Sequence, residues 1–219
     1  MNVNLVSITK PEIKGIKNPE DLVAFCARVS NPSNQMNVET APKLLKFLIK
    51  HKHWSPFELV DMCVEIKTSR GIAAQILRHR SFSFQEFSQR YSIANEFEDI
   101  ELRLQGDKNR QVGEILMKTN TDAYDKVNEL LIESLSLSQH CYDTMIENGV
   151  AKEVARMILP LTTQTTMYMK GSLRSWIHYL DLRTEKNTQK EHRLIAEDCK
   201  KIFMEQFPTI SEALEWKQE

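Results

Sequence analysis

The longest regular stretch of the chain is residues 121–149, TDAYDKVNELLIESLSLSQHCYDTMIENG. Its apolar residues recur every three or four positions, which is the spacing of one face of an α-helix. Gly149 stands where this helix should end, because glycine readily adopts the left-handed conformation found after helix C-termini. The stretch therefore predicts one long amphipathic helix that stops at Gly149.

Shorter stretches with helical spacing predict further helices. Asn18 is a favoured N-cap and Pro19 suits the first helical position, so a helix is expected to begin there. Thr68 or Ser69 would cap another helix, and Gly171 with Ser172 would open a third. The predicted helices are residues 18–30, 39–51, 69–80, 150–159, 173–183 and 188–207.

Three segments have the character of β-strands. Residues 2–9 alternate in polarity, residues 55–68 have the sequence SPFELVDMCVEIKT, and residues 161–170 are largely β-branched or aromatic. No repeat, low-complexity tract or linker divides the chain. We predict an α+β fold, a mainly helical single domain over residues 1–219 with a small, mostly antiparallel sheet.

Charge and cysteine content exclude several classes of protein. The 29 Lys and Arg residues nearly cancel the 30 Asp and Glu residues, so the surface as a whole should not attract nucleic acid or an anionic membrane. No apolar run has the length of a signal peptide core or a membrane span. The four cysteines lie far apart without a CxxC pair, which favours a reduced, cytoplasmic protein over a disulfide or zinc framework.

The stretch RHRSFSFQEFSQRY, residues 78–91, concentrates cationic side chains. On a helix, Gln75, Arg78 and His79 would share one face, and an arginine fork suits phosphate. An extended continuation would turn Glu86, Ser88 and Arg90 to one side. The pattern favours an anion site, although Arg and His could also simply complement the negative end of a helix.

Glu86 is the one acid among five Lys and Arg residues between positions 67 and 90. We expect it either to pair with an arginine or to bind a polar group of a ligand. Ser88 is a weak candidate nucleophile, because no base or GxSxG turn stands beside it. Arginines interleaved with phenyl rings would also suit a module that binds single-stranded nucleic acid, but the net charge of −1 argues against this alternative.

Two histidine patterns have simpler alternatives. His51 and His53 are two apart, a spacing that does not aim both at one metal ion, and we predict no metal site. His53 is better placed as a loop residue facing a pocket. Arg174 and His178 would share a helix face that could be merely solvated, and Arg183 is nine positions from Arg174, about half a turn out of phase.

The segment QILRHRSFSFQEFSQRY resembles the signature of flavin-dependent thymidylate synthases, RHRxxSxxExSxR with a glutamine three residues before it. Further stretches resemble the family in the same order along the chain. They are ARVSNP, HWSPFE, ARMILPL and GSLRSWIHYLDLR. The resemblance spans residues 28–183. Gln85 and Leu59 depart from the family, which commonly has Asn and His at these positions.

The resemblance implies a homotetramer with sites shared between subunits. It implies reductive methylation of dUMP to dTMP, with 5,10-methylenetetrahydrofolate as the carbon donor and NADPH-reduced FAD as the hydride source. None of the four cysteines has the setting of a nucleophile. The uracil ring would therefore be activated electrostatically, by Arg183 and the donors around it.

The resemblance also assigns residues to each ligand. FAD would contact Ser30, Ser55, Arg78, His79, Arg80, Glu86, Ser172, Leu173, Arg174 and His178. The substrate dUMP would contact Gln75, Arg78, Glu86, Phe87, Ser88, Gln89, Arg90, Arg156 and Arg183. The catalytic residues would be Arg183, which polarises the uracil ring, and His53, which would lie near the flavin and the folate.

Overall fold

The computed structural model describes residues 1–94, 96–107, 109, 112–113 and 115–216. Its strands form one four-stranded sheet in the spatial order β1-β2-β4-β3, and all neighbours are antiparallel. The strands are β1 Asn2–Ile8, β2 Asp61–Ser69, β3 Ser83–Glu86 and β4 Gln164–Ser172. The predicted mainly helical α+β fold with a small antiparallel sheet is therefore confirmed.

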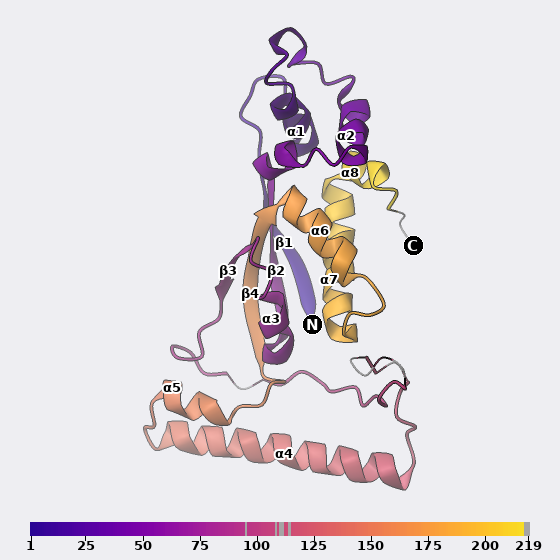
Figure 1. Cartoon of the computed structure of the whole chain (residues 1–219). Coiled ribbons are helices and arrows are strands. Elements are labelled where there is room, and N and C mark those ends of the chain that lie inside the picture. Colours follow the sequence, from indigo (N-terminus) through magenta and orange to yellow (C-terminus); the bar gives the residue numbers. More distant parts are fainter. Residues whose placement is uncertain (95, 108, 110–111, 114, 217–219) are drawn as a thin grey trace.

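Helices cover one face of the sheet and extend beyond both of its ends (Figure 1). The α-helices are α1 Pro19–Ala27, α2 Ala41–Lys50, α3 Arg70–Ile76, α4 Asp122–Glu147, α5 Lys152–Ala155, α6 Leu173–Arg183, α7 Lys190–Gln206 and α8 Pro208–Ala213. Short 3-10 segments are η1 Pro32–Asn34, η2 Ser55–Leu59 and η3 Arg156–Ile158. No described helix combines the length and the apolar character that crossing a membrane requires.

The core lies between the sheet and helices α3, α6 and α7. Alternate residues of β2 and β4, such as Val64 and Met167, are fully buried, as the two-residue period of a strand requires. Trp176 of α6 is buried against them, and its indole N–H donates to the carbonyl of Met62 at 2.9 Å. The opposite face of the same strands is more exposed, and Tyr168 lies there.

The two central strands each lead directly into a helix. Ser69 ends β2 and caps α3 by accepting from the N–H of Ile72, and Ser172 ends β4 and caps α6 by accepting from Ser175. Because Asp61 pairs with Ser172 and Ser69 with Gln164, these two helices begin at opposite ends of the sheet. Their C-terminal ends therefore approach each other over its middle (Figure 1).

A helical head lies at one end of the sheet and the long helix at the other (Figure 1). In the head, α2 packs against α8, and the Glu20 carboxylate on α1 accepts from the Ile210 N–H at 2.7 Å. At the other end, α4 packs against α5 and η3 rather than against the sheet. It is capped by Thr121 and followed by Gly149 with φ +77°, so the predicted helix and its glycine stop are confirmed.

The predicted strand over residues 55–68 was wrong in its first part. Residues 55–59 form η2, because Pro56 fits the first turn of a helix and lacks the N–H that a strand would use. The predicted helix over residues 69–80 ends at Ile76 and passes into tight turns. These turns return Phe82 to the core, where its ring lies 4.9 Å from that of Trp176. The position of Arg78 and His79 on a helix was therefore wrong as well.

The predicted extended run through Arg90 was also wrong. Strand β3 stops at Glu86, and the N–H groups of Tyr91 and Ser92 both donate to the Ser88 carbonyl at 3.0 Å, which closes a turn. Two smaller differences concern helices. Residues 150–159 divide into α5 and η3. Helix α8 was not predicted; Pro208 is its first residue, a position that proline favours.

Candidate active site

The end of α6 and the turn after α3 meet at a hydrogen bond between Arg183 and His79. Arg183 Nε donates to His79 Nε2 at 2.9 Å. His79 must then be neutral with its proton on Nδ1. Burial, reinforced by the charges of Arg183, His178 and Arg78, lowers the pKa of His79 to about 4. The neutral imidazole therefore accepts a hydrogen bond from the guanidinium and does not neutralise its positive charge.

Arg183 is only partly exposed, yet in the described part of the chain it forms no ion pair with a carboxylate. A cation withdrawn from water without a counter-charge is unfavourable unless a ligand supplies one. The bond to His79 engages Nε and leaves the two terminal amino groups of the fork available. This end of α6 can therefore hold an anionic or carbonyl-bearing ligand.

Behind this pair lies a polar cluster that the sequence did not reveal. The Tyr179 hydroxyl lies 3.2 Å from His192 Nε2, and His192 Nδ1 lies 3.3 Å from Gln75 Oε1. Burial, followed by the charges of Arg183 and His79, lowers the pKa of His192 to about 3. A signal existed: His192 shares the buried face of α7 with Ile195 and other apolar residues, where a histidine needs polar partners.

The other end of α6 carries a second group of candidate residues. Ser172 donates to the Glu58 carboxylate, and Arg174 Nη1 donates to Glu58 Oε1 at 2.7 Å. The hydrogen bond from Ser172, followed by Arg174, lowers the pKa of Glu58 against the effect of burial. Trp54, Arg174 and His178 line a hollow of about 450 Å³ at this end.

Three other candidate site residues, two of them expected flavin contacts, are close in sequence to residues that line this hollow. Leu173 has a fully buried side chain, its N–H donates to Val60, and its carbonyl takes part in the hydrogen bonding of α6, so none of its polar groups is left for a ligand. Ser55 is exposed at the start of η2. His53 is also exposed, and its ring lies 5.9 Å from that of Phe47. The expected place of His53 in a loop is confirmed.

A third group lies at the end of β3. Glu86 accepts from Arg70 Nη1 at 2.5 Å and from the Thr165 hydroxyl at 3.0 Å, so it pairs with an arginine, one of the two expected alternatives. Arg70 was not singled out from the sequence, because its partner lies sixteen positions away across a strand pair. Arg90 pairs with Glu153 of α5 at 3.1 Å, and both side chains are exposed.

Two polar atoms beside this third group have no partner among the described residues. They are Gln89 Nε2 and Arg156 Nε, both buried. Buried donors are rarely left unsatisfied in a complete structure, so each indicates a missing acceptor. Ser88 and Phe87 of the same stretch are exposed, as are Arg78 and Arg80 after α3. Phe87 and Ser88 therefore remain open to a ligand.

Ser30 belongs to a separate hollow of about 440 Å³ in the helical head. Arg28, one of its lining residues, is buried and donates to the Asn37 carbonyl and to Thr40 Oγ1, the latter at 2.8 Å. Arg28 therefore holds the turn before α2. Lys43 lines the same hollow and supplies a second cation.

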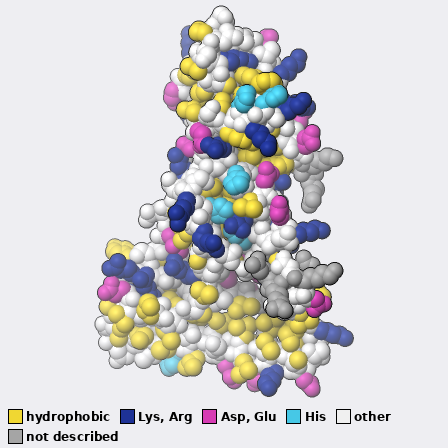
Figure 2. All heavy atoms as spheres, viewed as in Figure 1, with side chains coloured by type: hydrophobic (Ala, Val, Ile, Leu, Met, Phe, Trp, Pro, Cys, Tyr) yellow, Lys and Arg dark blue, Asp and Glu magenta, His cyan; other side chains and the backbone are white. Residues whose placement is uncertain are grey.

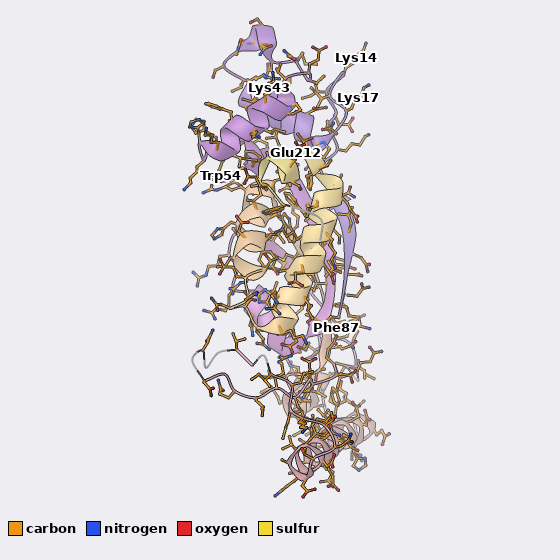
Figure 3. The ribbon with its side chains drawn as sticks, turned by 90° about the vertical axis from the view of Figure 1, so that its right-hand side faces the viewer. Lys14, Lys17, Lys43, Trp54, Phe87 and Glu212 are labelled. Carbon is orange, nitrogen blue, oxygen red and sulfur yellow. The ribbon has the colours of Figure 1, made fainter. Side chains whose placement is uncertain are left out.

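The candidate residues thus form separate groups within one chain. Figure 2 shows Lys, Arg and His side chains gathered over the middle of the face where α6 lies. Figure 3 shows Trp54 near the helical head and Phe87 far from it toward the other end of the sheet. The chain unites Gln75, His79 and Arg183 around one cluster, but it does not bring the residues near Trp54 and those near Phe87 into one pocket.

The four cysteines are free, and the predicted absence of a disulfide is confirmed for them. Burial raises the pKa of Cys26 and of Cys63, and it raises that of the fully buried Cys199 much further. A thiol with a raised pKa is a poor nucleophile at neutral pH. The position of Cys141 in α4 is remote from the polar cluster, because α4 packs on α5 and η3.

The sequence matches a known family over most of its length. Residues 13–209 match the family model described as Thymidylate synthase complementing protein. The chain is 49% identical, over 99% of its length and all of the relative, to a probable flavin-dependent thymidylate synthase of Paramecium bursaria Chlorella virus 1. It is 51% identical, over the same share of both chains, to the flavin-dependent thymidylate synthase of a Synechocystis species.

The fold is also known. The structure of a UMP/dUMP methylase, PolB, from Streptomyces cacaoi, bound with 5-Br dUMP, superposes with a TM-score of 0.82. That alignment covers 98% of this chain and 94% of the other, with 24% sequence identity. The family resemblance seen in the motifs is confirmed by near-complete matches at about half identity. This chain therefore belongs to the flavin-dependent thymidylate synthase family.

Proposed function

We propose that this protein is a flavin-dependent thymidylate synthase that methylates dUMP to dTMP. Membership of the family over nearly the whole chain supports the reaction. The observation that carries the proposal to this structure is the partly buried Arg183, supported by a neutral His79 and lacking a carboxylate partner among the described residues. A uracil ring that develops negative charge during methylation supplies the missing partner, and a fixed cation stabilises that charge.

The phosphate of dUMP has its own candidate residues. Arg90 lies on an exposed turn two residues after Ser88, and its present partner Glu153 is also exposed. Exposed ion pairs contribute little, so a phosphate can replace Glu153 at small cost. The unsatisfied Nε of Arg156 and the amide of Gln89 are further donors for the nucleotide. Phe87 and Glu86 complete the proposed substrate side.

The residues at the start of α6 fit a flavin. FAD is anionic and aromatic, and the hollow there offers Arg174, His178 and the indole of Trp54. Arg78, His79 and Arg80 follow α3 and provide further cationic or hydrogen-bonding groups, and Ser172 and Ser55 add hydroxyls. Bound flavin would supply the reducing equivalents of the reaction. The protein residues would bind and orient it, with Ser30 and Glu86 as additional contacts.

Self-association would unite the separate groups of residues. Helix α4 and the segment after it expose large apolar side chains, among them Leu130, Leu137 and Met157, with Leu137 68% and Met157 79% exposed. Apolar surface of this extent around one helix is typical of an interface between chains. We propose a homotetramer in which different subunits contribute to one site. Replacing both Leu130 and Leu137 by Glu should reduce the mass measured by light scattering and abolish activity together.

The remaining assignments rest on the family. NADPH would reduce the flavin, 5,10-methylenetetrahydrofolate would donate the carbon, and His53 would lie near the flavin and the folate. A reducing, cytoplasmic compartment fits the four free cysteines. Arg183 would act on the uracil ring, and no cysteine would attack it.

The proposal is tested by a spectrum and an assay of the purified protein. We expect flavin absorbance that bleaches with NADPH, and dTMP formation when dUMP and 5,10-methylenetetrahydrofolate are added. A protein that bound neither flavin nor dUMP would contradict the proposal. A colourless protein that bound single-stranded nucleic acid would instead support the alternative drawn from the arginine and phenylalanine pattern.

A further inference from the structure

A line of side-chain hydrogen bonds runs from the core to the surface through Gln75. Tyr179 Oη lies 3.2 Å from His192 Nε2, and His192 Nδ1 lies 3.3 Å from Gln75 Oε1. Gln75 Nε2 donates to Gln189 Oε1 at 2.7 Å, and Gln189 Nε2 donates to Glu191 Oε2 at 2.9 Å. Tyr179 and His192 are fully buried, so the inner half of the line is shielded from water.

Glu191 determines which group donates and which accepts in each hydrogen bond of this line. Burial acts to raise the pKa of Glu191, but hydrogen bonds from Arg103 and Gln189 outweigh it and the pKa is lowered. The carboxylate is therefore ionised at neutral pH and can only accept hydrogen bonds. Arg103 Nη2 donates to its Oε1 at 2.5 Å, so its Oε2 must receive the amide N–H of Gln189.

The remaining bonds follow from that first one. With its NH₂ turned to Glu191, Gln189 presents its carbonyl to Gln75, so Gln75 must present its own NH₂ in return. The carbonyl of Gln75 then faces His192 Nδ1, which must carry the single proton of a neutral imidazole. His192 Nε2 is left to accept from the Tyr179 hydroxyl. Reversing any one amide would set two acceptors against each other.

The fixed orientation of the Gln75 amide determines which of its polar groups can bind a ligand. Its carbonyl is held by His192 and one amide hydrogen by Gln189, which leaves the second amide hydrogen. Gln75, Gln189 and Glu191 line a hollow of about 370 Å³, within the range of small-molecule sites. A molecule bound in this hollow would lie beside the side chain of Gln75.

We propose that Glu191, Gln189 and His192 are positioning residues that fix Gln75 as an N–H donor to an oxygen acceptor of the bound nucleotide. The inference rests on dUMP being the substrate. The acceptor is a carbonyl oxygen of the base, which can accept a hydrogen bond but cannot donate one. A site built to donate to an oxygen discriminates against a nucleotide that places an amino group there, because two donors would then meet.

Glu191→Gln is the decisive variant. An amide at this position turns its oxygen to the Arg103 cation and its NH₂ to Gln189, which reverses every bond of the line. Gln75 then exchanges its carbonyl and amino positions, and the proton of His192 moves from Nδ1 to Nε2. Arg103→Gln is the matched control, because it breaks the same ion pair but leaves the acceptor-only carboxylate in place.

Two measurements test the proposal. Nitrogen-15 shifts of labelled His192, read without ligand, should show the Nδ1–H tautomer in the parent and in Arg103→Gln, and the Nε2–H tautomer in Glu191→Gln. By calorimetry on the flavin-loaded protein, Glu191→Gln should raise the dUMP dissociation constant about tenfold, and Arg103→Gln should change it less than twofold. Turnover at saturating dUMP should stay within about threefold of the parent.

A substrate analogue identifies the oxygen. If Glu191→Gln binds dCMP at least as tightly as the parent does, the acceptor is the 4-oxygen, because the 4-amino group of dCMP meets the Gln75 carbonyl in the variant. If dCMP binding is still about tenfold weaker in Glu191→Gln, the acceptor is the 2-oxygen.

An Nε2–H tautomer in the parent would overturn the inference. So would equal dUMP affinity in the parent and Glu191→Gln. A parent that bound no dUMP would overturn the proposed function itself.

Discussion

The two ends of α6 hold arginines in opposite electrostatic settings. Arg174, in the first turn, is exposed and paired with the carboxylate of Glu58 at 2.7 Å. Arg183, in the last turn, is partly buried and bonded to the neutral imidazole of His79. Within the described part of the chain, the charge of Arg174 has a carboxylate partner and the charge of Arg183 has none. The difference teaches that the exposure of an arginine does not show whether its charge has a partner in the protein.

The largest effect is expected at Arg183. Arg183→Ala should lower methyl transfer by about 10²- to 10³-fold, the loss typical of removing a group that stabilises developing negative charge. NADPH-driven flavin reduction should stay within a few-fold of the parent, because this half-reaction does not involve the uracil ring. Single-turnover measurements of both half-reactions make the comparison. Equal losses in both would show that Arg183 merely supports the end of α6.

Arg90 extends the comparison to a second exposed, paired arginine. Arg90→Ala should weaken dUMP binding by about 2 kcal/mol, or roughly thirtyfold, because a charge-assisted phosphate contact is lost. Flavin absorbance should remain. Glu153→Ala is the matched control, since it breaks the same exposed pair and should leave dUMP binding equal or slightly tighter. Unchanged dUMP titrations in Arg90→Ala would remove Arg90 from the phosphate site.

The neutral histidines around Arg183 predict a pH dependence of stability. The pKa is about 4 for His79 and about 3 for His192, against 6.5 for an ordinary histidine. As pH falls below 6.5, the unfolded chain takes up protons that the folded chain refuses. Stability is therefore fully present above pH 6.5 and declines by up to about 1.4 kcal/mol per pH unit for each histidine.

Urea unfolding between pH 7 and 5 measures this decline. His192→Gln should reduce the slope by about half, because His79 remains. A parent stability that did not change over this range would show that neither histidine is held neutral.

The smallest effects are expected from replacing the cysteines, which belong to neither of the two arginine settings compared above. Replacing Cys26, Cys63, Cys141 or Cys199 singly by Ala or Ser should leave dTMP formation within about tenfold of the parent. Cys199 is fully buried and can lose stability for packing reasons. Turnover by flavin-loaded, folded variants is the measurement. Complete loss in any one of them would point to a thiolate nucleophile and contradict activation by Arg183.

The rules for helix capping and for glycine correctly predicted the helix ends that depend on neighbouring residues. The caps at Asn18, Ser69 and Ser172 and the glycine after α4 lie where their side chains or backbone freedom require. The turns after α3 and β3 depend instead on distant groups. Phe82 must reach Trp176, so Arg78 and His79 leave the helix that their spacing predicted.

The sequence motif identified individual residues of the site. It did not identify the partners of those residues, because tertiary packing brings the partners to them. Arg183 and His79 are motif residues, but their mutual bond joins positions that are 104 residues apart. The sequence did not predict the ion pairs Arg90–Glu153 and Arg70–Glu86 either. Each pair depends on strand register or on the position of α5. His192 was overlooked because a single histidine on an apolar helix face carries no motif.

The central claim is that Arg183 acts on the pyrimidine ring, and the ionisation of bound dUMP tests it most directly. Nitrogen-15 spectroscopy of dUMP labelled at N3 reports whether that nitrogen holds its proton. In complex with the parent protein, the N3 pKa should lie below that of free dUMP, because the guanidinium stabilises the anion. In complex with Arg183→Ala it should return to or above the free value. An N3 pKa that is the same in both complexes would contradict the claim.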